Sequence, residues 1–417
     1  MSLPRHGVPR DEILGELAAL ARRDVDWRSG RAFSLAYHAG DDVLALASEV
    51  LASFQSTNAL NTAAFPSLRK LQRDVVETVA ELLHGGPEAA GFMTTGGTES
   101  LLLAVKAARE HGRARGVDEP EMLLPASAHA AFEKAAKYFG VRSVRVPVRD
   151  DFRADVEATA RALSPRTVLV VGSAPQYPQG VVDPIAELAR LAADAGVLCH
   201  VDACMGGITL PMLERLGRPI PPFDFRVPGV TSISVDLHKY GYTAKGASVI
   251  LHRSKDLRRH QTFVTENWLG GTYASSGILG TKSGGPIAAA WAVMRHLGED
   301  GYLRLTRAAR DATEALAGGL RRIPGVRVLA EPEATLLAFA FEPVGRAPAL
   351  DAFAVGEALA RRGFVVDPQK PPPSLHCTVN AVHGPVVPQF LSELRSAMEE
   401  VAAARTHAAQ RAYATLE

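Results

Sequence analysis

Apolar and polar positions follow two different periods along this chain. Residues 11–23 have apolar side chains at helical spacing, which predicts an amphipathic helix with one apolar stripe. Further helices are predicted at residues 42–54 and 67–83, the latter ended by the pair Gly85 and Gly86. The apolar stripe of the first helix consists of Ile13, Leu14, Leu17 and Leu20.

From residue 91 the pattern changes to short apolar runs that alternate with helical stretches. Runs of this length and composition are typical of strands buried in a mostly parallel sheet, and the alternation indicates an α/β domain. The predicted strands are 121–125, 142–146, 167–171, 197–202, 230–235 and 247–251, and a short stretch at 91–95 leads into a glycine turn. The helices predicted around them are 98–110, 130–139, 156–163 and 184–195.

The last third of the chain mixes helices and strands differently. It is helical from about residue 288 to 320 and again at 353–361 and 388–405, with strands at 326–329 and 335–341. A chain of 417 residues is too long for one compact core. We therefore expect an N-terminal helical segment (1–65), a large domain (66–295) and a small C-terminal α+β domain (296–417).

Composition and net charge limit the partners and the cellular compartment that we expect for the protein. A net charge of +1 gives no reason to expect nucleic acid as a partner. The three cysteines, an odd number without a C-x-x-C pair, favour a reducing compartment such as the cytoplasm. We expect no signal peptide, no transmembrane segment and no metal site.

The strongest chemical signal lies in residues 232–251, where an apolar strand ends in Asp236, His238 and Lys239. Lysine is rarely buried without a reason, and burial is expected to lower its pKa. A neutral amine is the nucleophile that imine chemistry needs. An exposed loop lysine beside an exposed histidine fits these residues equally well when they are taken alone.

Two further polar residues follow predicted strands. Asp202 ends a strand at the carboxyl edge, where open α/β sheets bind ligands, and its carboxylate suits a protonated pyridine nitrogen. A helix N-cap is the alternative role for this aspartate. His129 lies between a strand and a helix, where its ring suits stacking on a flat cofactor, although an exposed histidine fits as well.

A glycine turn precedes one predicted helix. Gly96 and Gly97 allow close approach of a ligand to the backbone, and Thr98 begins a helix whose free N–H groups favour a phosphate. The same residues also fit a capped helix that binds nothing. The turn matches neither a Walker loop nor the dinucleotide-binding glycine pattern.

These features occur in the order phosphate loop, histidine, aspartate and lysine. In their order and in the sequence around them, these features resemble the fold-type I pyridoxal-phosphate (PLP) enzymes of the group II decarboxylase superfamily, and within it the sphingosine-1-phosphate lyases. The resemblance implies PLP as cofactor and a large, mostly parallel seven-stranded sheet domain with a small C-terminal α+β domain. The motifs that carry it are TTGGTESLLLA, SAHAAFEKAA, GSAPQYPQGVVDP, HVDACMGG and SVDLHKYGYTAKGASV.

The resemblance also implies a role for each candidate residue. Lys239 carries PLP as an imine, Asp202 pairs with the pyridine nitrogen, and His129 stacks on the ring. The cofactor phosphate is held by Gly97, Thr98 and His238, and by Gly280 and Thr281 from the partner subunit of a homodimer. The substrate side is lined by Tyr37, Asn61, Tyr177 and Lys245, of which Lys245 is the candidate for the substrate phosphate.

Two positions depart from the family pattern. Asn61 stands where the family has histidine, so a titratable group becomes a neutral amide. Lys282 stands where the family has arginine, and it lacks the planar guanidinium fork.

The expected reaction is retro-aldol cleavage of a phosphorylated long-chain base, sphingosine-1-phosphate, to a long-chain aldehyde and phosphoethanolamine. The candidate bases are Lys239 once released, Tyr177 and the cofactor phosphate. An amino-acid decarboxylase on the same fold is the main alternative. A PLP-binding protein without turnover is another.

Overall fold

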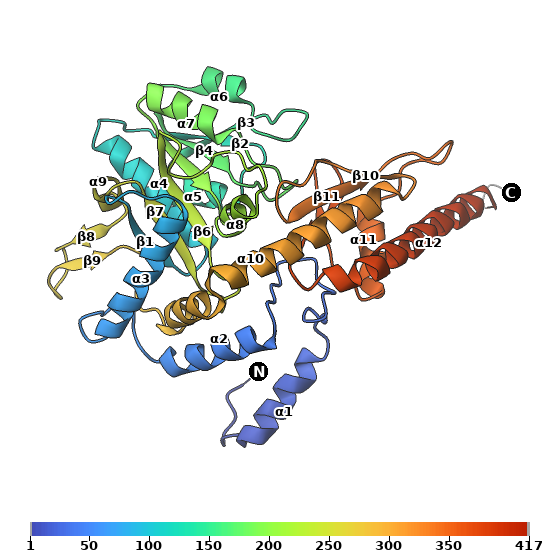
Figure 1. Ribbon diagram of the computed structural model, residues 1–417, viewed down its shortest axis with the longest axis horizontal. Coiled ribbons are helices and arrows are strands. Elements are labelled where there is room, and N and C mark those ends of the chain that lie inside the picture. Colours follow the sequence, from blue (N-terminus) through green and yellow to red (C-terminus); the bar gives the residue numbers. More distant parts are fainter. Residues whose placement is uncertain (1, 415–417) are drawn as a thin grey trace.

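The computed structural model describes residues 2–414, with side chains up to residue 404 (Figure 1). A seven-stranded sheet in the order β1-β7-β6-β5-β4-β2-β3 forms the centre of the large domain. Neighbouring strands are parallel except at β7, which runs antiparallel to both β1 and β6. The strands are β1 (Ala90–Thr94), β2 (Glu121–Pro125), β3 (Arg142–Val146), β4 (Thr167–Ser173), β5 (Leu198–Asp202), β6 (Val230–Asp236) and β7 (Ser248–His252). The expectation of a mostly parallel α/β sheet is therefore confirmed.

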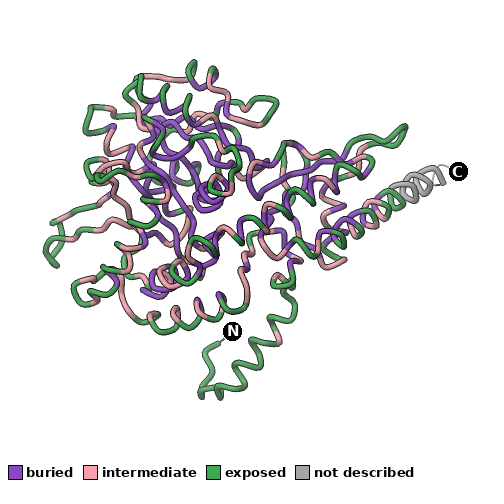
Figure 2. The backbone as a smooth tube through the Cα atoms, in the orientation of Figure 1, coloured by how far each residue is buried: buried purple, intermediate pink, exposed green. Residues whose placement is uncertain are grey.

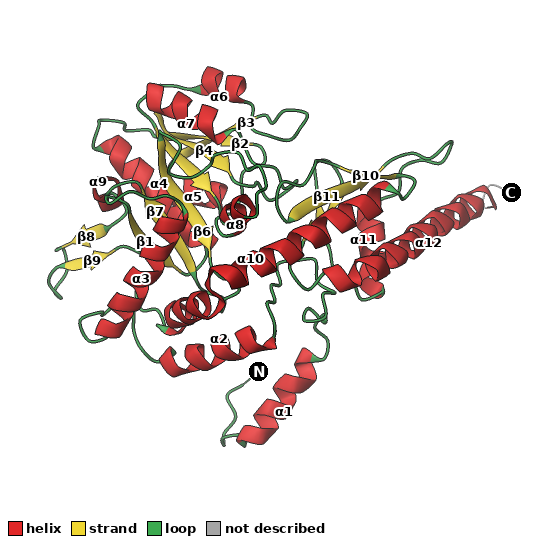
Figure 3. Cartoon of the chain, in the orientation of Figure 1, coloured by secondary structure: helices red, strands yellow, loops and turns green. Residues whose placement is uncertain are grey.

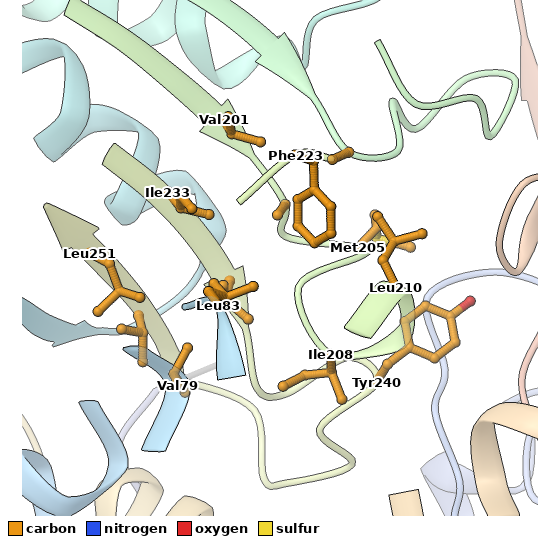
Figure 4. Packing of buried hydrophobic residues seen from close by; sticks show 14 of the residues in the cluster. Val79, Leu83, Val201, Met205, Ile208, Leu210, Phe223, Ile233, Tyr240 and Leu251 are labelled. Carbon is orange, nitrogen blue, oxygen red and sulfur yellow. The ribbon is translucent and has the colours of Figure 1, made fainter. Parts of the chain in front are cut away.

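Helices cover both faces of this sheet (Figure 3), and the central strands are therefore buried on both sides. On one face, α4 (Gly97–Arg113) and α5 (Ala131–Phe139) pack apolar side chains such as Leu101 and Phe132. On the other face lie α3 (Pro66–Leu82), α7 (Ile185–Asp194) and α8 (Thr209–Arg215). Figure 4 shows this second layer, where Val79 and Leu83 lie close to Ile233 and Leu251.

The carboxyl edge of the sheet collects the chain segments that carry polar residues. Strands β1, β2, β4, β5 and β6 point the same way, so the loops that follow them meet at one edge. These loops contain Gly96, His129, Tyr177 and Lys239, while Gly97 is the first residue of α4 and Asp202 is the last residue of β5. The topology therefore gathers segments that are far apart in the sequence.

The C-terminal domain is a four-stranded antiparallel sheet with helices on it. Its strand order is β10-β11-β13-β12, from β10 (Val326–Val328), β11 (Leu336–Phe341), β12 (Asp367–Gln369) and β13 (Ser374–Thr378). Helices α11 (Ala352–Arg361) and α12 (Val387–Ala414) pack against it. Phe33 from the N-terminal segment belongs to this core, stacked on His383 with ring centroids 4.1 Å apart.

Helix α10 (Gly285–Arg321) connects the two domains (Figure 1). Its backbone is non-helical at Gly298, where φ is 57°, so it consists of two helices joined at a kink. The predicted domain boundary at residues 295 and 296 falls inside α10, close to that kink. Its first half adds Ile287 and Val293 to the core of the large domain, and its second half adds Leu316 to the C-terminal core.

Two peripheral features stand out from the body of the molecule. Helix α1 (Arg10–Ala21) forms as predicted, yet it has no buried residue, and its apolar stripe is exposed (Figure 2). A hairpin of β8 (Phe263–Thr265) and β9 (Tyr273–Ser275) follows helix α9 (Lys255–Arg259) and lies at the left edge of the molecule in Figure 1, at the end away from α12. Among the described residues, no helix is both long and apolar enough to cross a bilayer. The remaining helices are α2 (Asp41–Phe54) and α6 (Val156–Ala162).

Candidate active site

A cavity of about 760 Å³ opens at the carboxyl edge of the sheet. Part of its wall comes from the C-terminal domain, through Asp367 of β12. The predicted site residues that line it are Gly97, Thr98, His129, Tyr177, Asp202, His238 and Lys239. The predicted residues Tyr37, Asn61, Lys245, Gly280 and Thr281 are not part of this wall.

Lys239 follows β6 by three residues, and its amine is paired with a carboxylate. The Nζ atom lies 2.9 Å from Oδ2 of Asp236, the last residue of β6. Burial lowers the pKa of Lys239, but the charge and hydrogen bond of Asp236, with help from Cys204 and Asp202, more than offset this, so the net pKa lies above its ordinary value. Burial acts in the expected direction, but the expected net lowering of the pKa is not found, because the strand also carries the carboxylate of Asp236.

Asp202 is nearly buried at the end of β5, with 8% of its surface exposed. Its Oδ1 accepts hydrogen bonds from the backbone N–H of Cys204 at 3.1 Å and from the hydroxyl of Ser234 at 3.4 Å. The next helix begins only at Thr209, so Asp202 does not cap it. A buried carboxylate that faces a cavity suits a cationic partner such as a protonated ring nitrogen.

The glycine turn after β1 is held by Glu99, in the first turn of α4. One oxygen of Glu99 accepts from the N–H and the hydroxyl of Thr95, both at 2.7 Å. The other oxygen accepts from the N–H of Ile278 at 2.8 Å. These bonds leave Gly97 and Thr98 at the N-terminus of the helix facing the cavity, where the helix dipole favours an anion.

Two histidines border the same cavity. His129 is exposed at the cavity wall, and its Nδ1 accepts from the N–H of Ala131. In His238, Nδ1 accepts from the N–H of Ala247 at 3.2 Å, so Nε2 carries the proton and lies 3.8 Å from Asp236. Burial lowers the pKa of His238 below its ordinary value. His238 is therefore a neutral hydrogen-bond donor near neutral pH.

Tyr177 lines the cavity from the loop after β4. Its hydroxyl donates to Oδ2 of Asp367 at 2.8 Å, and its ring lies against His376 with centroids 4.1 Å apart. Burial, with the nearby charge of Asp367, raises the pKa of Tyr177 well above its ordinary value. The phenol is therefore protonated at neutral pH and cannot act as a free phenolate.

Tyr37 and Lys245 lie beside the cavity and contact each other. The Lys245 amine lies 4.8 Å from the ring centroid of Tyr37 and donates to the carbonyl groups of Leu35 and His238, both at 3.2 Å. Burial lowers the pKa of Lys245. In this chain, Lys245 therefore anchors the segment around Leu35, and Leu35 itself reaches the cavity wall.

Asn61, Gly280 and Thr281 share an exposed face outside the cavity. The segments that carry them are joined by a backbone hydrogen bond of 2.9 Å from Ala59 to Lys282 and by a bond from the Asn58 amide to the Thr281 hydroxyl. All three predicted residues are exposed. They therefore lie together, but on the outside of the chain.

Lys282, the residue that replaces the family arginine, turns inward. Its amine donates to the carbonyl of Met93 at 2.7 Å and lies 4.1 Å from the ring centroid of Phe92. Burial lowers the pKa of Lys282 to about 8. Its role in this chain is to fasten the 271–285 loop to β1.

The wall of the cavity fits the groups of PLP. The amine of Lys239 suits the aldehyde, the carboxylate of Asp202 suits the ring nitrogen, and the N-terminus of α4 suits the phosphate. Among the described residues, the only atom within 4 Å of a Cβ added to Gly96 would be Cε1 of His238 at 3.3 Å, so the turn leaves room for a ligand. The residues present therefore fit this cofactor.

Sequence reasoning gave no role to Asp236, Asp367 or Glu99. Asp236 was visible as an acidic residue three positions before Lys239 in a strand, but its pairing depends on the local turn. Asp367 had no signal, because it reaches the cavity from another domain. Glu99 was read as a helix residue, and its link to the 271–285 loop requires tertiary structure.

Comparison with known proteins agrees with the fit of this site to PLP. The family model for the "Pyridoxal-dependent decarboxylase conserved domain" matches residues 1–342. A sphingosine-1-phosphate lyase of Arabidopsis thaliana is 41% identical over 401 residues, which cover 94% of this chain and 72% of that protein. A probable L-aspartate decarboxylase of Pyrococcus furiosus is 33% identical over 339 residues, 81% of this chain and 90% of that protein.

A solved structure is also similar over the full length. The sphingosine-1-phosphate lyase of Burkholderia pseudomallei has a TM-score of 0.91 and 38% identity, covering 100% of this chain and 96% of that one. The likeness therefore extends through the C-terminal domain that carries Asp367.

Proposed function

The chain belongs to the pyridoxal-dependent decarboxylase family and, within it, to the sphingosine-1-phosphate lyases, and we propose that it cleaves sphingosine-1-phosphate. The bond that breaks joins the carbon that carries the amine to the carbon that carries the hydroxyl. The products are a long-chain aldehyde and phosphoethanolamine. The observation that carries the proposal is the meeting of Lys239, Asp202 and the α4 N-terminus in one cavity, in a chain 41% identical to a lyase.

Each of the predicted residues in the cavity wall would hold a different part of the cofactor. Lys239 would bond the aldehyde carbon and Asp202 would keep the ring nitrogen protonated. His129 would contact the ring, and Gly97, Thr98 and His238 would bind the phosphate. When bound, PLP supplies an electron sink for the pair of electrons released by the broken bond.

The proton of the substrate hydroxyl needs an acceptor close to the reacting carbons. Tyr177 and Asp367 are suited to this as a pair, since the phenol already donates to the carboxylate at 2.8 Å. The hydroxyl proton moves to the oxygen of Tyr177 while the phenol proton moves to Asp367. Among the three candidate bases, this arrangement favours Tyr177 acting through Asp367.

A homodimer with shared active sites is part of the proposal. Asn61, Gly280 and Thr281 lie outside the cavity of their own chain, on a face that also exposes the apolar side chain of Leu60. These features support a homodimer in which this face of one subunit contacts the active site of the other. Mixing Lys239→Ala with a Thr281→Trp variant tests this, because hybrid dimers would regain one intact site while each parent stays inactive.

The cytoplasm is the proposed location. The three cysteines are all buried and free rather than paired, which suits a reducing compartment.

One competition experiment tests the reaction type. The PLP-loaded protein is incubated with sphingosine-1-phosphate and with a panel of amino acids, and the products are followed by mass spectrometry and by carbon dioxide release. We expect phosphoethanolamine and the aldehyde in equal amounts, without carbon dioxide. Carbon dioxide from an amino acid, with no aldehyde, would instead support the decarboxylase that the similarity to the Pyrococcus protein offers as a second candidate.

A further inference from the structure

Asp236 is a buried carboxylate in direct contact with the amine of Lys239. Only 2% of its surface is exposed. Its Oδ2 lies 2.9 Å from Nζ of Lys239, while its Oδ1 accepts from the hydroxyl of Ser248 at 2.6 Å. Each oxygen of the carboxylate thus has its own partner, which is the arrangement expected for a buried charge.

The carboxylate is also fixed in place by its surroundings. Ser248 is linked to Ser100 at 3.1 Å, and Ser100 to Thr94 at 2.7 Å, so a chain of hydroxyl groups ties Asp236 to α4 and β1. A Cβ on Gly97 would lie 2.8 and 2.9 Å from its two oxygens. The first residue of α4 therefore packs directly on Asp236, which leaves the carboxylate little room to turn away from Lys239.

Asp236 dominates the electrostatics of the lysine. Burial is the largest single influence and lowers the pKa of Lys239, but the charge and hydrogen bond of Asp236, together with Cys204 and Asp202, raise it above its ordinary value. The pKa of Asp236 stays low despite its burial, mainly because the charge of Lys239 opposes that effect, with a further contribution from the hydrogen bond of Ser248. The other titratable groups that face the pair are Lys245, Tyr37 and Tyr177.

We propose that Asp236 is a positioning residue that holds the free amine of Lys239 as an ammonium ion, and that it thereby sets the pH at which this lysine bonds the cofactor aldehyde. The nitrogen attacks the aldehyde carbon with its lone pair, so the ammonium ion must first lose a proton to solvent. The C–N bond then forms, and the aldehyde oxygen leaves as water. This inference rests on the proposed cofactor role of Lys239, and it holds for any substrate.

The rate of PLP capture by the apoprotein tests the proposal. It is followed by the absorbance of the new C=N link between about pH 6.5 and 9.5, with butylamine in parallel to correct for the titration of PLP itself. For the wild type we expect a rise of about tenfold per pH unit, since only the neutral amine reacts. Asp236→Asn removes the carboxylate charge, so capture near pH 7 should be at least about tenfold faster, with a flatter profile.

Two controls separate charge on the lysine from other effects. Ser248→Ala removes the partner of Oδ1 but keeps the carboxylate, and it should retain the wild-type profile. Pyridoxal, which lacks the phosphate, should show the same acceleration, whereas simple repulsion between Asp236 and the phosphate would accelerate PLP alone and overturn the proposal.

The proposal can also be overturned without any variant. A wild-type capture rate that does not change with pH over this range would mean that Lys239 is already neutral. With the variant, a profile for Asp236→Asn that coincides with the wild type would mean that Asp236 does not set the charge of Lys239, and would also overturn the proposal. Because no substrate is present, failure of the proposed lyase reaction leaves this test unaffected.

Discussion

The hydroxyl of Tyr177 donates a hydrogen bond of 2.8 Å to Oδ2 of Asp367, joining the loop after β4 to strand β12 of the C-terminal domain. Oδ1 of the same carboxylate accepts from the hydroxyl of Ser34 at 2.6 Å. Three segments that are remote in the sequence thus converge on one carboxylate at the cavity wall. This convergence explains why the site needs both domains.

Replacement of the phenol should reduce turnover far more than cofactor binding. In Tyr177→Phe the ring remains but the hydroxyl is lost, so we expect kcat to fall about 100-fold or more while PLP uptake is unchanged. Steady-state kinetics with absorbance titration of PLP measures both. Ser34→Ala, which leaves the bond between Tyr177 and Asp367 intact, is the matched control. A wild-type kcat for Tyr177→Phe would remove Tyr177 from the proton path.

Asp202 should matter through its charge rather than its shape. Asp202→Asn keeps the size of the side chain but leaves the ring nitrogen without an anionic partner, so we expect turnover to fall on the order of 100-fold. Ser234→Ala keeps the charge of Asp202 but removes its hydrogen bond of 3.4 Å, along with the contacts of that hydroxyl with His200 and Cys204, and should cost less than about tenfold. If the two variants lose equal activity, the hydrogen bond rather than the charge is what matters.

Gly97 should tolerate no side chain. A Cβ there would approach both oxygens of Asp236 and, at 2.8 Å, the Sγ of Cys204, so Gly97→Ala should destabilise the fold by about 1–3 kcal/mol and weaken PLP binding. Gly86→Ala, where no atom lies within 4 Å of an added Cβ, is the control. Thermal unfolding of the two apoproteins decides the matter, and equal melting temperatures would refute the packing argument.

Buried histidines should make the fold less stable in mild acid. Burial lowers the pKa of His200, His252, His376 and His383 to about 4 each. Between pH 6.5 and 4 the unfolded chain takes up protons that the folded chain excludes, so this stability is complete above pH 6.5 and is lost as the pH falls. Near pH 5, each histidine costs up to about 2 kcal/mol.

One buried acid acts in the opposite direction. Burial raises the pKa of Asp183 to about 6, so the folded chain binds a proton there that the unfolded chain does not, and the resulting stability is lost as the pH rises through 6. Four histidines outweigh one aspartate. Urea unfolding should therefore give a smaller free energy at about pH 5 than at about pH 7. An equal or larger value at pH 5 would contradict the neutral state of these histidines.

The sequence predicted the sheet strands well because they are short, apolar and separated by clear helical stretches. Strands β2 and β3 have the predicted ends, since Pro120 precedes β2 and Pro147 follows β3. Helix α8 was missed because Pro211 lies inside it, and proline usually ends a helix. Strand β13 was missed because its sequence, Ser374–Thr378, mixes polar and apolar residues although all five are buried.

The site was predictable only where a residue follows its own strand. Asp202 and Lys239 could be placed at the carboxyl edge because the parallel sheet brings the strand ends together. The pairing of Tyr177 with Asp367 crosses 190 positions of sequence and two domains, and no local pattern contains it. Likewise, the exposure of Asn61 and Thr281 outside the cavity depends on how two distant segments pair.

The most direct test of the account is to identify the lysine that carries the cofactor. The PLP-loaded protein is reduced with borohydride, digested, and analysed by mass spectrometry for the pyridoxyl group. We predict the group on Lys239, and its loss in Lys239→Ala together with all turnover while the fold is kept. A pyridoxyl group on Lys245 or Lys282 instead, or full turnover by Lys239→Ala, would contradict the account.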